Sequence, residues 1–103
     1  MGYPVSKVCC WASGQVATDG TGSCLKAVTT ARTGAGVYTY TLFYPIDATE
    51  RQLVTTARTA TLFLSTYADT SDTVITATYA TSAANVATDC AHTFMVWRIS
   101  NVA

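Results

Sequence analysis

The sequence predicts an all-β fold, a single β-sandwich of jelly-roll or Greek-key type with seven to eight short strands. Thr, Val and Tyr are abundant, and these residues fit a pleated, half-buried surface. Apolar and polar residues alternate with period two in several short stretches, and turn-forming residues separate these stretches. A chain of 103 residues is long enough for one core, so we expect one domain spanning residues 1–103.

The clearest strand is the segment 36–45, "GVYTYTLFYP". Alternation predicts that Tyr38, Tyr40, Leu42 and Tyr44 share one face, which we interpret as a core or subunit contact. The preceding Gly34-Ala35-Gly36 supplies a tight turn in which a glycine adopts a positive φ, and Pro45 ends the strand.

Similar patterns predict the remaining strands. We expect them at Val8–Ala12, Ser23–Arg32, Leu53–Arg58, Thr61–Tyr67, Thr73–Tyr79 and Thr93–Ile99. The last of these is apolar on both faces, with Phe94 and Val96 on one and Met95, Trp97 and Ile99 on the other. Segments Asp47–Gln52 and Ser82–Val86 each have room for one helical turn, which is too short for a stable helix.

Charge is scarce and balanced. Only 12% of the residues are charged and the net charge is zero. Without a basic patch, we expect no nucleic-acid partner. No apolar segment is long enough for a signal peptide or a bilayer span, so we expect no membrane association and synthesis in a cytoplasm. Sparse charge also suggests that part of the surface is covered by partners.

The cysteines raise the question of metal or redox chemistry. Cys9, Cys10, Cys24 and Cys90 lack the C-x₂₋₄-C spacing of zinc sites, so we expect no metal. If Val8–Ala12 pairs with Ser23–Val28, Cys9 or Cys10 faces Cys24 and a disulfide is conceivable. We favour four reduced, buried thiols, because a cytoplasm keeps cysteines reduced.

Catalytic patterns are weak. Cys90 and His92 are separated by one residue, which permits a nucleophile and its base, but no orienting group follows from the sequence. We interpret His92 as a polar residue at the rim, at a junction between loop and strand. No nucleophile elbow, phosphate-binding loop or dinucleotide fingerprint is present, so we expect neither an enzyme nor a cofactor.

The charged residues have structural interpretations. Turn chemistry accounts for four carboxylates: Asp19, Asp69, Asp72 and Asp89. The arginines outnumber the lysines, which suggests paired or interfacial charges. We interpret Arg32, Arg51, Arg58 and Arg98 as partners of Asp47 and Glu50 across subunits, or else as single exposed charges at the rim.

The order of these segments resembles a known class of protein. "SKVCCWASG", "DGTG", "AVTTART", "GAGVYTYTL" and "HTFMVWRIS" follow one another as in the small all-β modules of bacteriophage tail fibres, head fibres and capsid-decorating proteins. The resemblance implies a virion-surface β-sandwich, frequently trimeric and without catalytic residues. It implies structural roles for the matching positions: Lys7, Trp11, Gly34, Gly36, Tyr38, Tyr40, Phe94 and Trp97.

The resemblance and the low charge predict a structural protein of a phage particle. We expect a capsid-decorating, or cement, protein on the virion surface that binds the major capsid protein across capsomers as a homotrimer. The alternative is a tail- or neck-fibre module that binds a host glycan through an exposed tyrosine such as Tyr67 or Tyr79. A secreted domain held by two disulfides is a further alternative.

Overall fold

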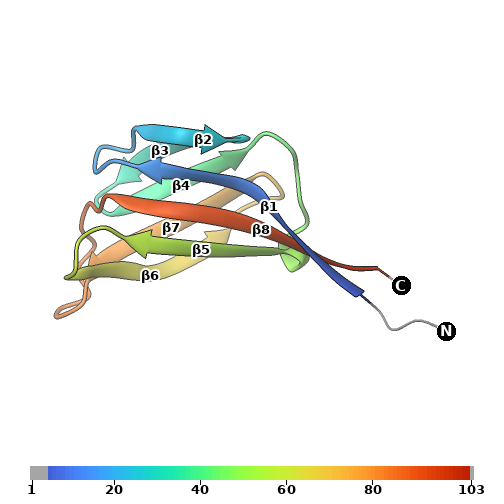
Figure 1. Cartoon of the computed structure of the whole chain (residues 1–103). Helices are drawn as coiled ribbons and strands as arrows, with labels where there is room; N and C mark the ends of the chain where they lie inside the picture. The colour runs from blue at the N-terminus through green and yellow to red at the C-terminus, as the bar shows by residue number, and fades with distance from the viewer. Residues whose placement is uncertain (1–4, 103) are drawn as a thin grey trace.

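The computed structural model describes residues 5–102, and the side chains of residues 8–99. Two four-stranded antiparallel sheets pack as a sandwich, which confirms the predicted fold class (Figure 1). Sheet A has the order β2-β1-β8-β5 and sheet B the order β3-β4-β7-β6. The strands are β1 (Val5–Val16), β2 (Gly22–Lys26), β3 (Val28–Gly34), β4 (Val37–Leu42), β5 (Arg51–Ala57), β6 (Leu62–Asp69), β7 (Val74–Thr81) and β8 (His92–Val102).

On both sides of the sandwich, the chain joins an edge strand of sheet A to an edge strand of sheet B. β2 leads directly into β3, so the chain itself joins the two sheets along one side. On the other side, β5 is the edge of sheet A and β6 is the edge of sheet B, and residues 58–61 connect them. β5, β6 and β7 follow one another and β8 returns to pair with β5, which is the Greek-key order.

β1 and β8 are the longest strands and extend beyond their neighbours. Their pairing runs from Val16↔His92 to Val5↔Val102, whereas β5 pairs with β8 only as far as Arg98. Beyond that point the two strands form a ribbon that projects from the sandwich (Figure 1). An isolated two-stranded ribbon is marginally stable in water, so this one depends on the sheet from which it grows.

The prediction of one strand over Ser23–Arg32 was wrong. The chain bends at Ala27, where φ is +57°, and the two halves enter different sheets as β2 and β3. A positive φ is unusual for an alanine, and no glycine marks the corner. Residues 23–32 contain no glycine or proline, so no turn residue marked the break.

The core confirms the alternation predicted for residues 36–45. Tyr38, Tyr40 and Leu42 are buried between the sheets, and they pack with β7 and β8 side chains. Gly36 has the predicted positive φ of +71°, and a Cβ there would lie 2.5 Å from the carbonyl oxygen of Tyr79. From the last strand, Phe94 and Val96 enter the same core.

A β-bulge interrupts the strand predicted at Val8–Ala12, in which simple alternation would place Trp11 and Ala12 on opposite faces. The β1–β8 register shifts between Cys10 and Ala12, so Trp11 is an extra residue in the ladder. Ala12 is buried in the core, and Trp11 packs against that core from its rim. The Trp11 indole donates a hydrogen bond to the Tyr44 carbonyl, 3.1 Å away. Lys7, the other residue that the resemblance marks in this segment, has its side chain outside the described residues.

The two predicted helical turns have different outcomes. Ala48–Glu50 forms a 3-10 turn, η1, and the Asp47 carboxylate caps it by accepting a bond from the Thr49 amide at 2.8 Å. The segment 82–86 contains turns and no helix, and it ends with an isolated bridge between Ala80 and Ala87.

Candidate binding surfaces

A polar cluster lies in the centre of the core around His92. The His92 ring is fully buried at the start of β8, so the prediction of a rim histidine was wrong. It stacks on Tyr79 with ring centroids 4.2 Å apart, and its Nε2 lies 2.6 Å from the Tyr40 hydroxyl. That hydroxyl lies 3.1 Å from the hydroxyl of Tyr79. A period-two pattern predicts which face a residue takes but does not indicate what surrounds it.

The hydrogen bonds fix the direction of each donor in this cluster. His92 Nδ1 lies 2.8 Å from the Cys90 carbonyl, which only accepts, so Nδ1 carries the proton. Nε2 therefore accepts from Tyr40, and the Tyr40 oxygen accepts from Tyr79. Burial lowers the pKa of His92 and raises the pKa of both tyrosines, that of Tyr79 to about 12. The cluster is therefore uncharged around neutral pH, and it joins sheet A to sheet B.

Cys90 is not placed as a nucleophile for His92. Its thiol is fully buried and donates to the Ala91 carbonyl at 3.2 Å, while its amide donates to the Tyr38 hydroxyl. Burial raises the pKa of the thiol, which disfavours the reactive thiolate. Both nitrogens of His92 are already engaged, so the pair is part of the core.

The other cysteines correct the predicted cross-strand pairing. β2 pairs with β1 from Ser13↔Lys26 to Val16↔Gly22, beyond the adjacent Cys9 and Cys10. Cys24 lies where this register shifts, and its φ is +52°. All four thiols are free, as favoured, but only Cys90 is buried, so the expectation of four buried thiols was wrong.

Three of the four arginines form ion pairs within the chain, which corrects the prediction of pairing across subunits. Arg32 Nε lies 2.8 Å from an oxygen of Asp89, and this oxygen also accepts from the Gly36 amide. These two bonds lower the pKa of Asp89. Arg98 lies 3.3 Å from Glu50 and 5.3 Å from the Trp11 ring. Within the described residues, Arg58 has no ion-pair partner.

Arg51 joins the end of β5 to the loop between β6 and β7. Its side chain is 1% exposed, and its Nε lies 2.8 Å from an Asp69 carboxylate oxygen. The guanidinium also donates to backbone carbonyls of Ile46, Ser71 and Asp72. With so many acceptors around it, Arg51 holds this end of the sandwich together.

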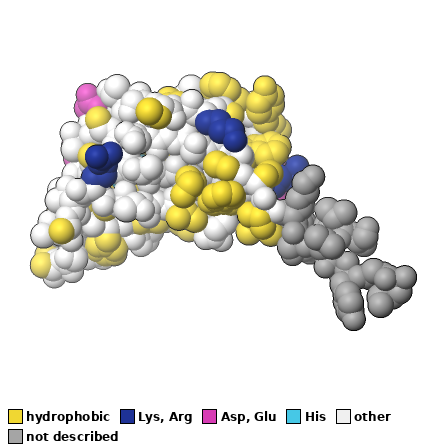
Figure 2. Space-filling view, in the orientation of Figure 1, with side chains coloured by type: hydrophobic (Ala, Val, Ile, Leu, Met, Phe, Trp, Pro, Cys, Tyr) yellow, Lys and Arg dark blue, Asp and Glu magenta, His cyan; other side chains and the backbone are white. Residues whose placement is uncertain are grey.

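The outer face of sheet A carries an apolar patch. Cross-strand pairing places Val8 beside Ile99, Cys10 beside Trp97, and Met95 beside Val54 on this face. Figure 2 shows hydrophobic side chains gathered there, over β1 and β8. We name this set the outer patch: Val8, Cys10, Val54, Met95, Trp97 and Ile99. Val8 is 55% exposed and Ile99 41%, so the patch is open to solvent in the single chain.

The outer face of sheet B is different, because threonine dominates it. Thr39 pairs with Thr76, and Thr78 pairs with Thr66, on the face opposite the buried tyrosines. Their hydroxyls keep that face hydrated while the branched side chains fit the strands. The molecule therefore has one apolar outer face, on sheet A, and one polar outer face, on sheet B.

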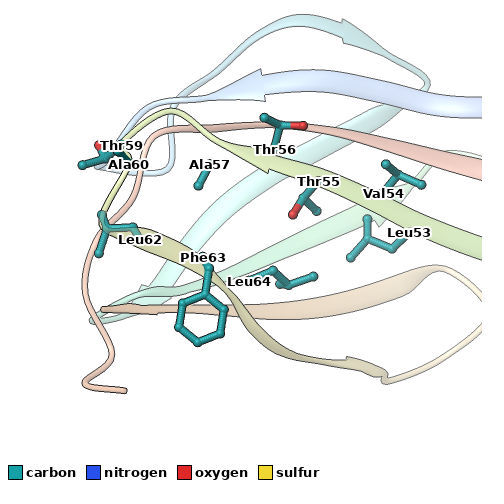
Figure 3. A pocket seen from close by; sticks show the side chains of 10 residues that line it. All are labelled: Leu53, Val54, Thr55, Thr56, Ala57, Thr59, Ala60, Leu62, Phe63 and Leu64. Atoms are coloured by element: carbon teal, nitrogen blue, oxygen red, sulfur yellow. The ribbon is translucent and has the colours of Figure 1, made fainter. Parts of the chain in front are cut away.

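A groove of about 580 Å³ lies between the edge strands β5 and β6 (Figure 3). None of its lining residues is charged, and they are Leu53, Val54, Thr55, Thr56, Ala57, Thr59, Ala60, Leu62, Phe63 and Leu64. Both strands that border it are sheet edges. The groove is therefore a second surface suited to contact with another chain.

The two tyrosines proposed for glycan binding have opposite outcomes. Tyr67 is 43% exposed, but Tyr79 is fully buried in the histidine cluster. Among the described side chains, the most exposed aromatic ones are instead Phe43 and Tyr44, which follow β4. Their exposure depends on where β4 ends, and alternation placed Tyr44 on the core face.

Within the part of the chain that the structure describes, no three His, Cys, Asp or Glu side chains group closely enough to hold a metal ion. The described residues also contain no helix that could span a membrane. No protein family's sequence model matches the chain, and neither a curated protein nor a solved structure shows a significant match to it. The resemblance to phage modules stays a prediction.

Proposed function

We propose that this chain is a non-catalytic structural protein of a bacteriophage particle that decorates the capsid. The observation that supports this function best is the outer patch, an exposed apolar area on one face of a sheet whose counterpart is polar. Contiguous exposed apolar surface on a small domain is typical of a protein-binding site. The segment resemblance gives this site its partner, the major capsid protein.

The site would act by binding rather than by chemistry. A homotrimer, which the resemblance implies, would contact neighbouring capsomers through part of the outer patch and the projecting ends of β1 and β8. A ligand that binds only the assembled shell stabilises that shell by its binding free energy. Cys90 and His92, the only catalytic pair that the sequence suggested, are buried and hydrogen-bonded in the core.

The test is co-sedimentation with shells assembled from the major capsid protein of the same genome. We expect saturable binding of the wild type. Ile99→Lys, which adds a charge to the outer patch, should weaken binding by about tenfold or more, since a buried unpaired charge is costly. Thr41→Lys adds the same charge to the outer face of sheet B and serves as the matched control. Equal binding by both variants, or no binding by the wild type, would refute the proposal.

A fibre module that binds a host glycan is the second candidate, favoured by the adjacent exposed rings of Phe43 and Tyr44. Aromatic rings provide an apolar stacking face with a polar edge. If this candidate is correct, the protein is retained on host envelope polysaccharide, and Tyr44→Ala removes retention while Ile99→Lys does not. The two proposals therefore predict opposite results for the same pair of variants.

A further inference from the structure

The four sheet edges differ in how well they are protected against pairing with another strand. β2 carries Lys26 and a register shift, β3 has a shift beside Arg32, and β6 has a shift between Leu64 and Thr66. Bulges and charges are the usual ways in which proteins prevent such pairing.

β5 has neither protection. Seven consecutive residues, Arg51–Ala57, pair with β8 without a shift. Residues 52–57 include no charge, glycine or proline, and Arg51 is engaged inside the sandwich. The other edge of β5 borders the groove, whose lining is uncharged (Figure 3). This regular edge is therefore available to a further strand.

We propose that β5 pairs antiparallel with β5 of a second copy of this chain across a two-fold axis at Val54. In an antiparallel ladder, opposed residues either both direct their N–H and C=O groups at each other or both direct them away. The two-fold axis must therefore pass between a residue of one strand and the same residue of the other strand. Val54 is the midpoint of β5, so this register uses all seven residues of each strand.

Charge complementarity selects the same register and favours a second copy as the occupant. With Val54 opposite Val54, the next positions beyond the strand place Arg58 opposite Glu50 of the second copy, twice by symmetry. Arg58 is the arginine without an ion pair among the described residues. Glu50 contacts Arg98 through one carboxylate oxygen only, so its second oxygen can accept from Arg58. Centring the pair on Leu53 or Thr55 instead opposes Glu50 to Thr56 or Ala60.

The pairing would also cover apolar surface. Val54 is 41% exposed and Phe63, on the β6 side of the groove, is 40% exposed. A two-fold axis beside β5 places the two Val54 side chains next to each other on the outer face of the joined sheet, and it brings the two grooves, with Phe63, face to face. The result is one continuous eight-stranded sheet with a hydrophobic contact beneath it.

This inference does not rest on the capsid role. The two-fold contact uses the edge of β5, whereas the capsid contact involves the projecting ends of β1 and β8 and the part of the outer patch beside them. A trimer can therefore also pair with a neighbouring trimer across a two-fold axis. Failure of shell binding leaves the β5 contact intact, and failure of the β5 contact leaves shell binding intact.

The first test measures self-association by sedimentation velocity over a concentration series. We expect wild-type association to weaken by about tenfold or more in Val54→Lys, because like charges then oppose each other at the axis. Val86→Lys, at an exposed loop valine, is the matched control and should associate like the wild type. Association that survives Val54→Lys, or a wild type that stays monomeric at about 100 µM, overturns the proposal.

The second test identifies the register by cross-linking in a background in which Cys9, Cys10 and Cys24 are replaced by Ser. Val54→Cys should form a disulfide-linked dimer on mild oxidation, since position 54 opposes itself. Gln52→Cys should not, because position 52 opposes Thr56. Cross-linking at 52 but not at 54, or equal cross-linking at both, contradicts this register. A strand of another protein in this position would leave both variants uncross-linked, which also counts against the second copy.

Discussion

The hydroxyl of Tyr40 is the central link of the buried histidine cluster, and Tyr40→Phe removes it. In the wild type this oxygen donates to His92 Nε2 at 2.6 Å and accepts from the Tyr79 hydroxyl at 3.1 Å. The phenylalanine ring can keep the stacking of Tyr40 on Phe94, where the centroids are 4.2 Å apart. The substitution therefore tests the hydrogen bonds with little change in packing.

The expected cost follows from the two groups left without a partner. An unsatisfied buried donor or acceptor costs about 1–3 kcal/mol, and Tyr40→Phe creates one of each. Removing the buried hydroxyl itself recovers part of this loss, so we expect the free energy of unfolding to fall by about 2–4 kcal/mol. Within the described residues, no buried side-chain nitrogen or oxygen lacks a partner in the wild type, so the variant introduces unsatisfied groups into a fully paired core.

The assay is equilibrium urea unfolding at pH 7, followed by tryptophan fluorescence. Tyr44→Phe is the matched control, because its side chain is exposed and water already satisfies its hydroxyl; we expect a change within about 0.5 kcal/mol. A Tyr40→Phe variant as stable as the control would show that the hydroxyl does not link His92 to Tyr79 and that the donor order in the cluster is not fixed.

Three further predictions concern other residues. Because burial lowers the pKa of His92 below its unfolded value of about 6.5, the unfolded chain binds the extra proton. Stability measured by urea unfolding should therefore fall as the pH drops below about 6.5, by up to about 1.4 kcal/mol per pH unit, and a flat profile from pH 7 to 5 would contradict the burial. Arg51→Ala should lower the unfolding free energy by about 2 kcal/mol or more, because it leaves backbone carbonyls and Asp69 without their partner. Arg51→Lys should recover only part of this loss. Calorimetry that finds no loss in Arg51→Ala would show that Arg51 does not hold this end of the sandwich together. Ala27→Gly should raise stability by about 0.5–1 kcal/mol in the same urea assay, because glycine adopts a positive φ without strain, whereas a loss would show that the bend is not strained.

The strands and their inward faces were largely predictable because alternation is a local signal. Tyr38, Tyr40 and Leu42 lie in the core as their spacing predicted, and so do Phe94 and Val96. Two errors have one cause: the bulge at Trp11 and the bend at Ala27 each break the local order without a glycine or proline to mark it.

The candidate surfaces were only partly predictable, since a surface combines residues from strands that are distant in the chain. The two apolar faces of the last strand were evident from Phe94 to Ile99, and they indicated that something covers its outer side. The contribution of Val8 and Val54 to the same patch depends on the strand order β1-β8-β5, which alternation cannot supply. The groove likewise depends on which strands become the edges.

By itself, the sequence determined that this chain is an all-β sandwich, which strands bury their tyrosines, and that few charges cover its surface. Tertiary structure alone decided that His92 lies at the centre of the core, that Arg32, Arg51 and Arg98 pair within the chain, and that β5 is left as an unprotected edge. The physical reason is the distance along the chain over which each effect acts. Backbone alternation acts between neighbours, whereas burial, ion pairing and edge exposure depend on which distant strands meet.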